Sequence, residues 1–445
     1  MKDLTQGSVP RHLVAMSVPI AVGMLLQTLY LLVDLYFVAR LGDAAIAGVG
    51  AAGNLMFAVF ALTQMLGVGT VALMSHAVGR KDREEANHIF NQSVVLATFC
   101  AFATLVFGYL ITDAYMHLVG ADAATMAAGA TFLLWYIPGL ALQFALVVMG
   151  SALRGTGIVK PTMVVQMLTV VLNAILAPIL IAGWGTGIPM GVAGAGLASS
   201  VSVAVGVVVL AIYFLRLEKY VRFDVSQWRP RTATWLRMLN IGLPAGGEFA
   251  LLGVYSALIY WIIRDFGAAA QAGFGIGSRL TQAIFLPAIA IAFGAAPLAG
   301  QNFGAKLPGR VRETFRVAAI SGCTIMVVLA AFAQWKGQWL ARAFTTDADV
   351  IRYATQFLQI VSWNFVAVGL VFTCSSMFQA LGNTWPSLAS SGMRLITFAL
   401  PAVWLSTRPG FEIVDVWHLS VATVLLQAAV SFALLQWQFR VRLAV

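Results

Sequence analysis

The sequence predicts an all-α polytopic membrane protein, with twelve transmembrane helices arranged as two pseudo-symmetric six-helix lobes. The first observation is composition: the 445 residues are 60% hydrophobic and only 10% charged, whereas soluble domains carry about 25% charged residues. The second is that apolar runs long enough to cross a bilayer recur along the whole chain. The third is that the two halves carry similar landmarks in the same order. A β-barrel would instead show short alternating segments and more polar residues.

Taken in order, the apolar runs define twelve expected spans, each longer than the roughly 20 residues that cross a ~30 Å hydrocarbon core. Their residue ranges are 13–38, 46–77, 89–112, 125–150, 160–183, 190–215, 239–263, 270–299, 314–335, 350–379, 384–406 and 416–439. Proline interrupts several of them, as at Pro19, Pro138 and Pro244. Because each proline removes a backbone donor and can kink its helix, the pattern favours bending helices over a static bundle.

The basic residues predict the topology. With both termini in the cytoplasm, 19 of the 27 lysines and arginines lie on the cytoplasmic side, 6 lie outside, and Arg279 and Arg394 fall within spans. This asymmetry follows the positive-inside rule, which explains the net charge of +10 without invoking nucleic acid as a partner. We expect a multi-pass protein of the bacterial cytoplasmic membrane, monomeric and surrounded by lipid.

A basic polar stretch divides the chain near its middle. It predicts three parts: an N-terminal six-helix lobe of residues 1–215, a cytoplasmic linker of residues 216–238, and a C-terminal six-helix lobe of residues 239–445. Shifted by 225 positions, Pro19 falls on Pro244 and the Gly/Ala cluster at 42–50 falls on 267–275; residues 152–161 align with 379–386 at a shift of 227. Since six helices precede the second copy, the repeat is parallel, and such proteins place substrate and ion sites near the midplane.

Two acidic side chains inside apolar runs are the candidate working groups of a transporter. Glu248 lies about ten residues into 239–263, near the bilayer midplane at ~1.5 Å rise per residue, and Asp34 lies in the first span. A charge there costs at least ~2.5–3.5 kcal/mol, so such residues mark ion or substrate pathways. Gln27 and Tyr30 share one helix face with Asp34, and Tyr255 shares the face of Glu248. Further polar side chains within the spans are Asn173, Asn364 and Gln379.

Several stretches resemble the multidrug and toxic compound extrusion (MATE) family, and together they cover nearly the whole chain. They are VDLYFVARLGDAAIAGVG at 33–50, SHAVGRKDREEA at 75–86, ALRGTGIVKP at 152–161, GVAGAGLASS at 191–200, AGQNFGAKLPGRV at 299–311 and FQALGNTWP at 378–386. The resemblance implies a V-shaped pair of lobes, alternating access, and export of organic cations driven by inward H⁺ or Na⁺.

The resemblance also assigns roles to single residues. The family's first-helix aspartate maps onto Asp34 and its fifth-helix asparagine onto Asn173. Three departures bear on the coupling ion. Ala177 stands where some members carry an aspartate, Glu248 lies about one turn earlier than the family's usual seventh-helix acid, and the run 353–380 holds no acid.

The chemistry of a buried carboxyl group suits exchange. Burial favours its neutral form; when protonated it does not attract an organic cation, and when ionised it does, so the proton and the drug compete. Sodium would need about five to six converging oxygens and preferably two carboxylates. Because the repeat places the two acids in different lobes, protons are favoured over sodium. No cofactor is expected beyond the coupling ion.

Arg279 and Arg394 leave two alternatives open, because a buried arginine stays charged. Either they pair with the acids or with helix carbonyls, or they line the cavity and bind an anionic group. The second alternative would suit a flippase for a lipid-linked precursor of the same superfamily. An enzyme is not expected, since no DDxxD-like cluster is present, and the absence of GxxxxGK[ST] disfavours an ATP-driven pump.

Overall fold

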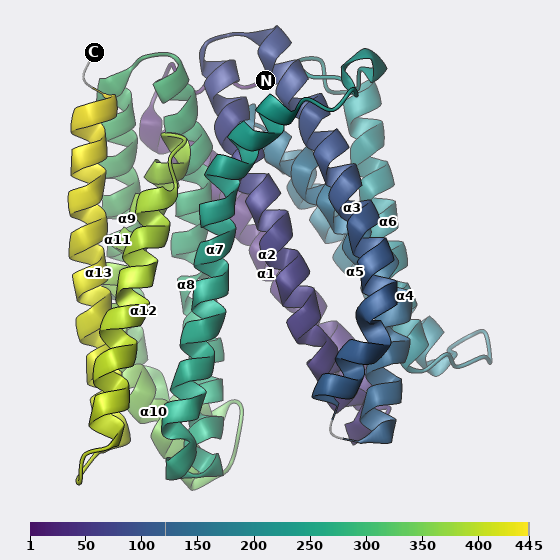
Figure 1. The fold of residues 1–445 in the computed structure, drawn as a ribbon, viewed down its shortest axis with the longest axis vertical. Helices are drawn as coiled ribbons and strands as arrows, with labels where there is room; N and C mark the ends of the chain where they lie inside the picture. The colour runs from purple at the N-terminus through teal and green to yellow at the C-terminus, as the bar shows by residue number, and fades with distance from the viewer. Residues whose placement is uncertain (121, 444–445) are drawn as a thin grey trace. The chain divides into compact units, whose positions relative to one another are not determined.

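The computed structural model describes residues 1–120 and 122–443, apart from the side chain of Leu31. Figure 1 shows its α-helices, and the label η is used in the text for a 3₁₀ turn. Their bounds are α1 (Val9–Ala39), α2 (Asp43–Gly79), α3 (Arg83–Val119), α4 (Ala123–Gly155), α5 (Lys160–Ala182), α6 (Val192–Arg216), η1 (Val225–Gln227), α7 (Thr232–Ile263), η2 (Arg264–Phe266), α8 (Ala268–Gly304), α9 (Pro308–Arg342), α10 (Ala348–Val361), η3 (Ser362–Asn364), α11 (Phe365–Ala380), α12 (Trp385–Ser406) and α13 (Ile413–Arg442). Twelve segments of the described chain are long and apolar enough to cross a bilayer, which confirms the predicted all-α fold and its number of spans.

Several helices continue beyond their apolar runs. α3 and α9 each begin six residues before the predicted span. Hydropathy marks the part of a helix that crosses the hydrocarbon core and does not mark the helical turns that lie in the headgroup region. At the start of α3, Asp82 accepts the backbone N–H of Glu85 at 2.9 Å. Such an N-cap satisfies a donor that has no partner within the helix.

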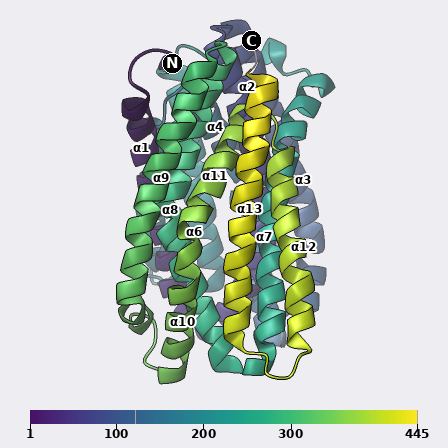
Figure 2. The same ribbon diagram turned by 90° about the vertical axis from the view of Figure 1, so that its left-hand side faces the viewer.

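The tenth span is broken, which the sequence did not indicate. α10 and α11 are separated by the 3₁₀ turn η3 (Figure 2), and backbone freed by such a break needs a partner inside the membrane. Gln334 of α9 supplies one, since its side-chain amide donates to the carbonyl of Gln359 at 2.5 Å and to the Ser362 hydroxyl at 2.8 Å.

The internal repeat is visible in the backbone. Gly42 and Gly267, 225 positions apart, precede α2 and α8 with φ of 104° and 89°. Within the described chain, the non-glycine residues with positive φ are Lys81 and Lys306, again 225 apart. Gly157 and Gly382 have φ of 80° and 70°, so the shift of 227 predicted for this segment is wrong, and the repeat keeps one offset of 225 throughout.

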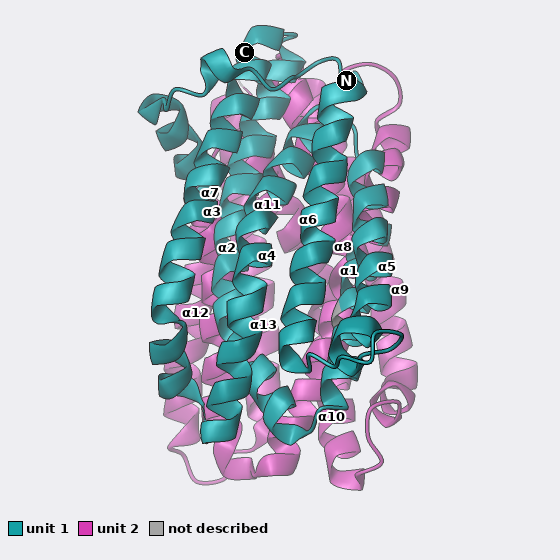
Figure 3. Ribbon diagram, turned by 90° about the vertical axis from the view of Figure 1, so that its right-hand side faces the viewer, with its two compact units in different colours: residues 1–3, 22–242 teal, residues 4–21, 243–445 magenta. Residues whose placement is uncertain are grey.

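The chain forms two compact units, coloured separately in Figure 3. Unit 1 comprises Met1–Asp3 and Val22–Gly242, and unit 2 comprises Leu4–Ala21 and Leu243–Val445. The first part of α1 therefore belongs to unit 2 and the first part of α7 to unit 1, which differs from the predicted lobe boundaries at 215 and 239. Pro19 and Pro244 lie within two residues of these crossings, where the lost backbone hydrogen bond permits a helix to change direction.

Small residues allow close helix packing in unit 1. A Cβ on Gly48 of α2 would lie 2.6 Å from the backbone nitrogen of Gly129 in α4, and one on Gly196 of α6 would lie 2.6 Å from the carbonyl of Phe132 in α4. Aromatic rings pack in the core of unit 2. The ring of Trp417 lies 4.8 Å from Phe357 and 5.6 Å from Phe274, which is within the range of favourable aromatic pairs.

The linker is fixed to unit 1 by amide side chains of α3. Asn91 donates to the carbonyl of Arg222 at 3.0 Å and accepts the N–H of Asp224 at 2.9 Å and the Trp228 indole N–H at 3.0 Å. Gln92 in turn accepts the N–H of Arg231 at 2.9 Å. Within the linker, the Ser226 hydroxyl and N–H keep the pKa of Asp224 below its usual value.

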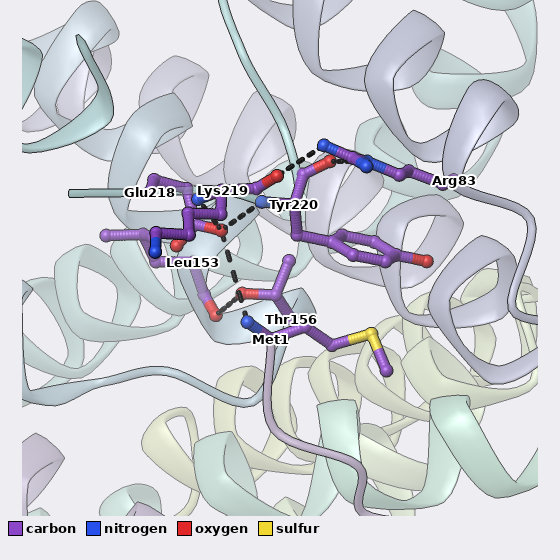
Figure 4. Close-up of polar contacts among 7 residues, drawn as sticks. All are labelled: Met1, Arg83, Leu153, Thr156, Glu218, Lys219 and Tyr220. Carbon is purple, nitrogen blue, oxygen red and sulfur yellow. Dashed lines mark hydrogen bonds and ion pairs between the residues drawn. The ribbon is translucent and has the colours of Figure 1, made fainter. Parts of the chain in front are cut away.

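Figure 4 shows how the start of the linker is held. The buried carboxylate of Glu218 accepts the backbone N–H groups of Lys219 and Tyr220 at 3.1 and 2.8 Å, and Arg83 donates to the carbonyls of the same two residues. The Met1 amino group lies 4.0 Å from Glu218. The next residues of the chain dock on unit 2, where Leu4 is fully buried.

Candidate functional site

Glu248 is surrounded by hydroxyl groups in unit 2. Its Oε2 accepts hydrogen bonds from Ser387 at 2.9 Å and Ser375 at 3.3 Å, and its Oε1 accepts one from Ser391 at 3.3 Å. The Gln427 amide donates to Ser391 at 3.1 Å, so four helices, α7, α11, α12 and α13, contribute to this site. None of the ion pairs found among the described residues involves Glu248.

Three oxygens at this site form a closed triangle. Besides their contacts with Oε2, the hydroxyls of Ser375 and Ser387 lie 2.9 Å apart. Each serine hydroxyl carries one proton. When Glu248 is ionised, two protons are available for three oxygen–oxygen contacts, and one contact has no proton between its two oxygens. A proton on Glu248 fills the third contact, and so would a cation bound among the oxygens. The geometry therefore suits a carboxyl group that exchanges its compensating positive charge.

Arg394 lies one turn along α12 from this serine cluster. Its guanidinium carbon is 4.3 Å from the centre of the Tyr255 ring, and Tyr255 shares a face of α7 with Glu248. The Tyr255 hydroxyl hydrogen-bonds Ser420 at 2.8 Å, and its ring lies 4.7 Å from that of Phe398. Arg394 is absent from the ion pairs of the described chain, so the prediction that it pairs with one of the two acids is wrong.

Asp34 lies in unit 1, in a second cluster of polar groups. The Asn173 amide lies beside its carboxyl group, and the Tyr30 hydroxyl lies near Ser199 of α6 and near Asp34. Asp34 Oδ1, the Tyr30 hydroxyl and both polar atoms of Asn173 are buried without a hydrogen-bond partner. Because burying an unpartnered polar atom is costly, this cluster is suited to hold a water molecule or a cation. Ala177, fully buried one turn beyond Asn173, offers only a methyl group.

The sequence matches the model of a known protein family. The family model described as MatE matches residues 19–179 and 244–405. The chain belongs to the MATE family. The two matched segments begin at Pro19 and Pro244, the prolines that the internal repeat places 225 positions apart.

Bacterial relatives of this MATE protein are similar over most of their length. It is 26% identical to the multidrug export protein MepA of Staphylococcus saprophyticus over 85% of this chain and 83% of that protein. It is 24% identical to a protein of Shewanella oneidensis named as an FAD transporter, over 92% and 91% of the two chains. It is 25% identical to YpnP of Bacillus subtilis, a probable multidrug resistance protein, over 93% and 90%.

Solved structures of MATE transporters share the fold. A crystal structure described as MATE in the bent conformation superposes with a TM-score of 0.93 at 22% identity, covering 99% of this chain and 97% of that one. The Vibrio cholerae transporter VcmN in its bent form superposes with a TM-score of 0.88 at 24% identity, covering 98% of each chain. The family model and the twelve candidate spans of the described chain together make this MATE chain a multi-pass membrane transporter.

The predicted site residues are spread over both units of this MATE protein. Gln27, Tyr30, Asp34 and Asn173 belong to unit 1, and the others belong to unit 2. Gln27 and Arg279 are exposed. Asn364 is buried in η3 with its amide oxygen unpartnered, and Gln379 lies one turn of α11 beyond Ser375. In the described chain, no group of three or more His, Cys, Asp and Glu side chains is arranged to hold a metal ion.

The sequence missed the serines around Glu248. Ser387, Ser391 and Arg394 are spaced at i, i+4 and i+7 and so share one face of α12. That spacing was readable beforehand, but serine is a common small residue at membrane-helix contacts, so its presence alone predicts no ligand. No spacing pattern in the sequence of α11 distinguishes Ser375 as a contact of Glu248.

Proposed function

We propose that this MATE transporter exports organic cations, drugs among them, in exchange for protons, and that Glu248 and Asp34 carry the coupling protons. The observation that carries the proposal is that the hydrogen-bond partners of Glu248 in the described chain are neutral hydroxyls. A carboxylate in this setting attracts a positive charge, and a proton and an organic cation compete for it. The multidrug relatives in Staphylococcus and Bacillus support the substrate class.

Sodium is the alternative coupling ion, and a specific observation bears on it. The two carboxylate oxygens of Glu248 and three serine hydroxyls amount to five oxygens, which meets the lower end of the number that sodium needs. The observed contacts of 2.9 to 3.3 Å are ordinary hydrogen-bond distances that a proton alone can complete. The Asp34 cluster has one carboxylate, since Ala177 lies one turn beyond Asn173 in α5, and this also favours protons.

Dye efflux from proteoliposomes tests the proposal. Wild type, Glu248→Gln and Asp34→Asn are compared under an imposed pH gradient and, separately, under a sodium gradient. We expect wild type to export a cationic dye under the pH gradient, and Glu248→Gln to lose at least about tenfold in rate, because glutamine cannot exchange a proton. Export by both variants at the wild-type rate would refute the role of these acids, and export under the sodium gradient alone would replace the proton with sodium.

A further inference from the structure

Arg394 is a positive charge inside a membrane span without an acidic partner in the described chain. Its Nε atom is buried and has no hydrogen-bond partner, and part of the side chain remains accessible. Arginine stays ionised in proteins, and a charge at this depth is costly unless water or an opposite charge compensates it. The Nε–H lacks an acceptor in the described chain, and the accessible part of the side chain is open to an acceptor that does not belong to the protein.

The guanidinium is held in place and does not reach toward the membrane surface. It rests on the Tyr255 ring, which is itself fixed by the Tyr255–Ser420 hydrogen bond and by the Phe398 ring. Arg394 lies nine residues after the start of α12 and twelve before its end, which is about 13 Å and 18 Å at ~1.5 Å per residue. A lipid headgroup at either surface is too distant to be its acceptor.

We propose that Arg394, oriented by Tyr255, is an anion-binding site in unit 2 that takes a carboxylate or phosphate group of the transported molecule. A guanidinium presents parallel N–H donors that match the two oxygens of such a group. Packing one face of the guanidinium on an aromatic ring leaves the edge with its donors free for the ligand.

Glu248 and the proposed Arg394 site together indicate which charged groups the substrate carries. Glu248 and Tyr255 are seven residues apart on α7, about 10 Å along the helix axis at ~1.5 Å per residue, and Ser391 lies between the two charges on α12. The negative and positive groups therefore stand on one polar stripe of unit 2. A molecule with both a cationic and an anionic group matches it better than a simple cation does. This inference rests on the proposed function, whose substrates it narrows.

A matched pair of dyes tests the site. Rhodamine 110 carries a free carboxylate, whereas rhodamine 123 is its methyl ester with the same ring system. The purified full chain in nanodiscs of zwitterionic lipid is titrated with each dye by fluorescence anisotropy, without any gradient. For Arg394→Gln we expect the Kd of rhodamine 110 to rise about 10- to 100-fold, the loss typical of a hydrogen bond to a charged group, and the Kd of rhodamine 123 to change less than about twofold.

Three further variants sharpen the result. Arg394→Lys keeps the charge without the paired donors and should lose an intermediate amount for rhodamine 110 only. Tyr255→Leu removes the ring under the guanidinium and should do the same. Arg408→Gln, which removes an exposed arginine that rests on the Trp404 ring just beyond the end of α12, is the matched control and should leave the binding of both dyes unchanged. Retained binding of rhodamine 123 shows that each variant is folded.

Three outcomes would overturn the proposal. Equal weakening of both dyes would mean that Arg394 acts on structure or through Glu248, and unchanged binding of rhodamine 110 would mean that it binds no anion. Displacement of rhodamine 110 when phosphatidylglycerol is added to the nanodiscs would identify a lipid phosphate as the ligand instead. Because no gradient is used, these results stand apart from the efflux test of coupling.

Discussion

At the scale of single residues, the chemistry depends on small neutral partners of one acid. Glu248 is recognisable in the sequence as a functional residue, because placing an acidic side chain in the bilayer core costs free energy and such residues usually have a function. Its surroundings are not, because serines from three positions on two helices converge only through tertiary packing. The same holds for Arg394: the sequence allowed it to pair with an acid, and only the structure shows it resting on Tyr255.

Replacing Ser387 by alanine should slow transport. The change removes the shortest hydrogen bond to Glu248, 2.9 Å long, and a hydrogen bond to a charged group contributes about 1.5–3 kcal/mol. We expect gradient-driven dye efflux to fall by about tenfold. Ser390→Ala is the matched control, because the Ser390 hydroxyl donates to the carbonyl of Ser387 in its own helix, and it should export at the wild-type rate. Equal rates for the two variants would show that the hydroxyl at 387 does not serve Glu248.

At the scale of elements, the hydropathy pattern located the helices but not how they are held. It gave no sign of η3, because single polar residues such as Ser362 and Asn364 also occur within unbroken spans and no proline lies near the break. The side chain that compensates for the break, Gln334, lies in a different helix. The linker was predicted as a basic loop, yet it is a fixed segment whose backbone groups are bonded to amides of α3. Pairings of this kind depend on tertiary contacts, which periodicity does not report.

Asn91→Ala should loosen the linker. The variant loses three hydrogen bonds to linker groups, each contributing about 0.5–1.5 kcal/mol. Trypsin should then cut after Arg222 and Arg231 several times faster than in wild type, as followed by gel or mass spectrometry. Thr98→Ala on the same helix serves as control, because the Thr98 hydroxyl is exposed and donates to its own helix. Protection of Asn91→Ala at the wild-type level would contradict this account of the linker.

At the scale of the whole molecule, the repeat was readable from the sequence, while the division into units was only partly so. The alignment of Pro19 with Pro244 predicts the repeat correctly, but the loops do not mark the boundaries of the units, which exchange the first parts of α1 and α7. Hydropathy cannot reveal this, because a helix has the same composition whichever neighbours its two ends contact. The last segment of the repeat was also misaligned by two residues, because glycine identities were matched without knowledge of φ.

Leu4→Ala should destabilise unit 2. Leu4 is fully buried, its N–H donates to Gln301 Oε1 at 3.0 Å and its carbonyl accepts from Asn302 and Arg310 at 3.3 and 3.2 Å. Truncating a buried leucine costs about 2–5 kcal/mol, so the Tm in detergent should fall by several degrees. Val14→Ala, at a side chain that is 60% exposed, should leave the Tm unchanged; a similar Tm for both variants would mean that Leu4 contributes little.

The first parts of α1 and α7 each belong to the unit formed mainly by the other half of the chain. Two six-helix halves that each lend the start of their first helix to the other are related like the protomers of a domain-swapped dimer, joined here in one polypeptide. A nick in the linker would leave each fragment with a portion folded into both units. Such a nicked protein should stay one particle, and a gene split at the linker should still specify a complete transporter when both pieces are made together.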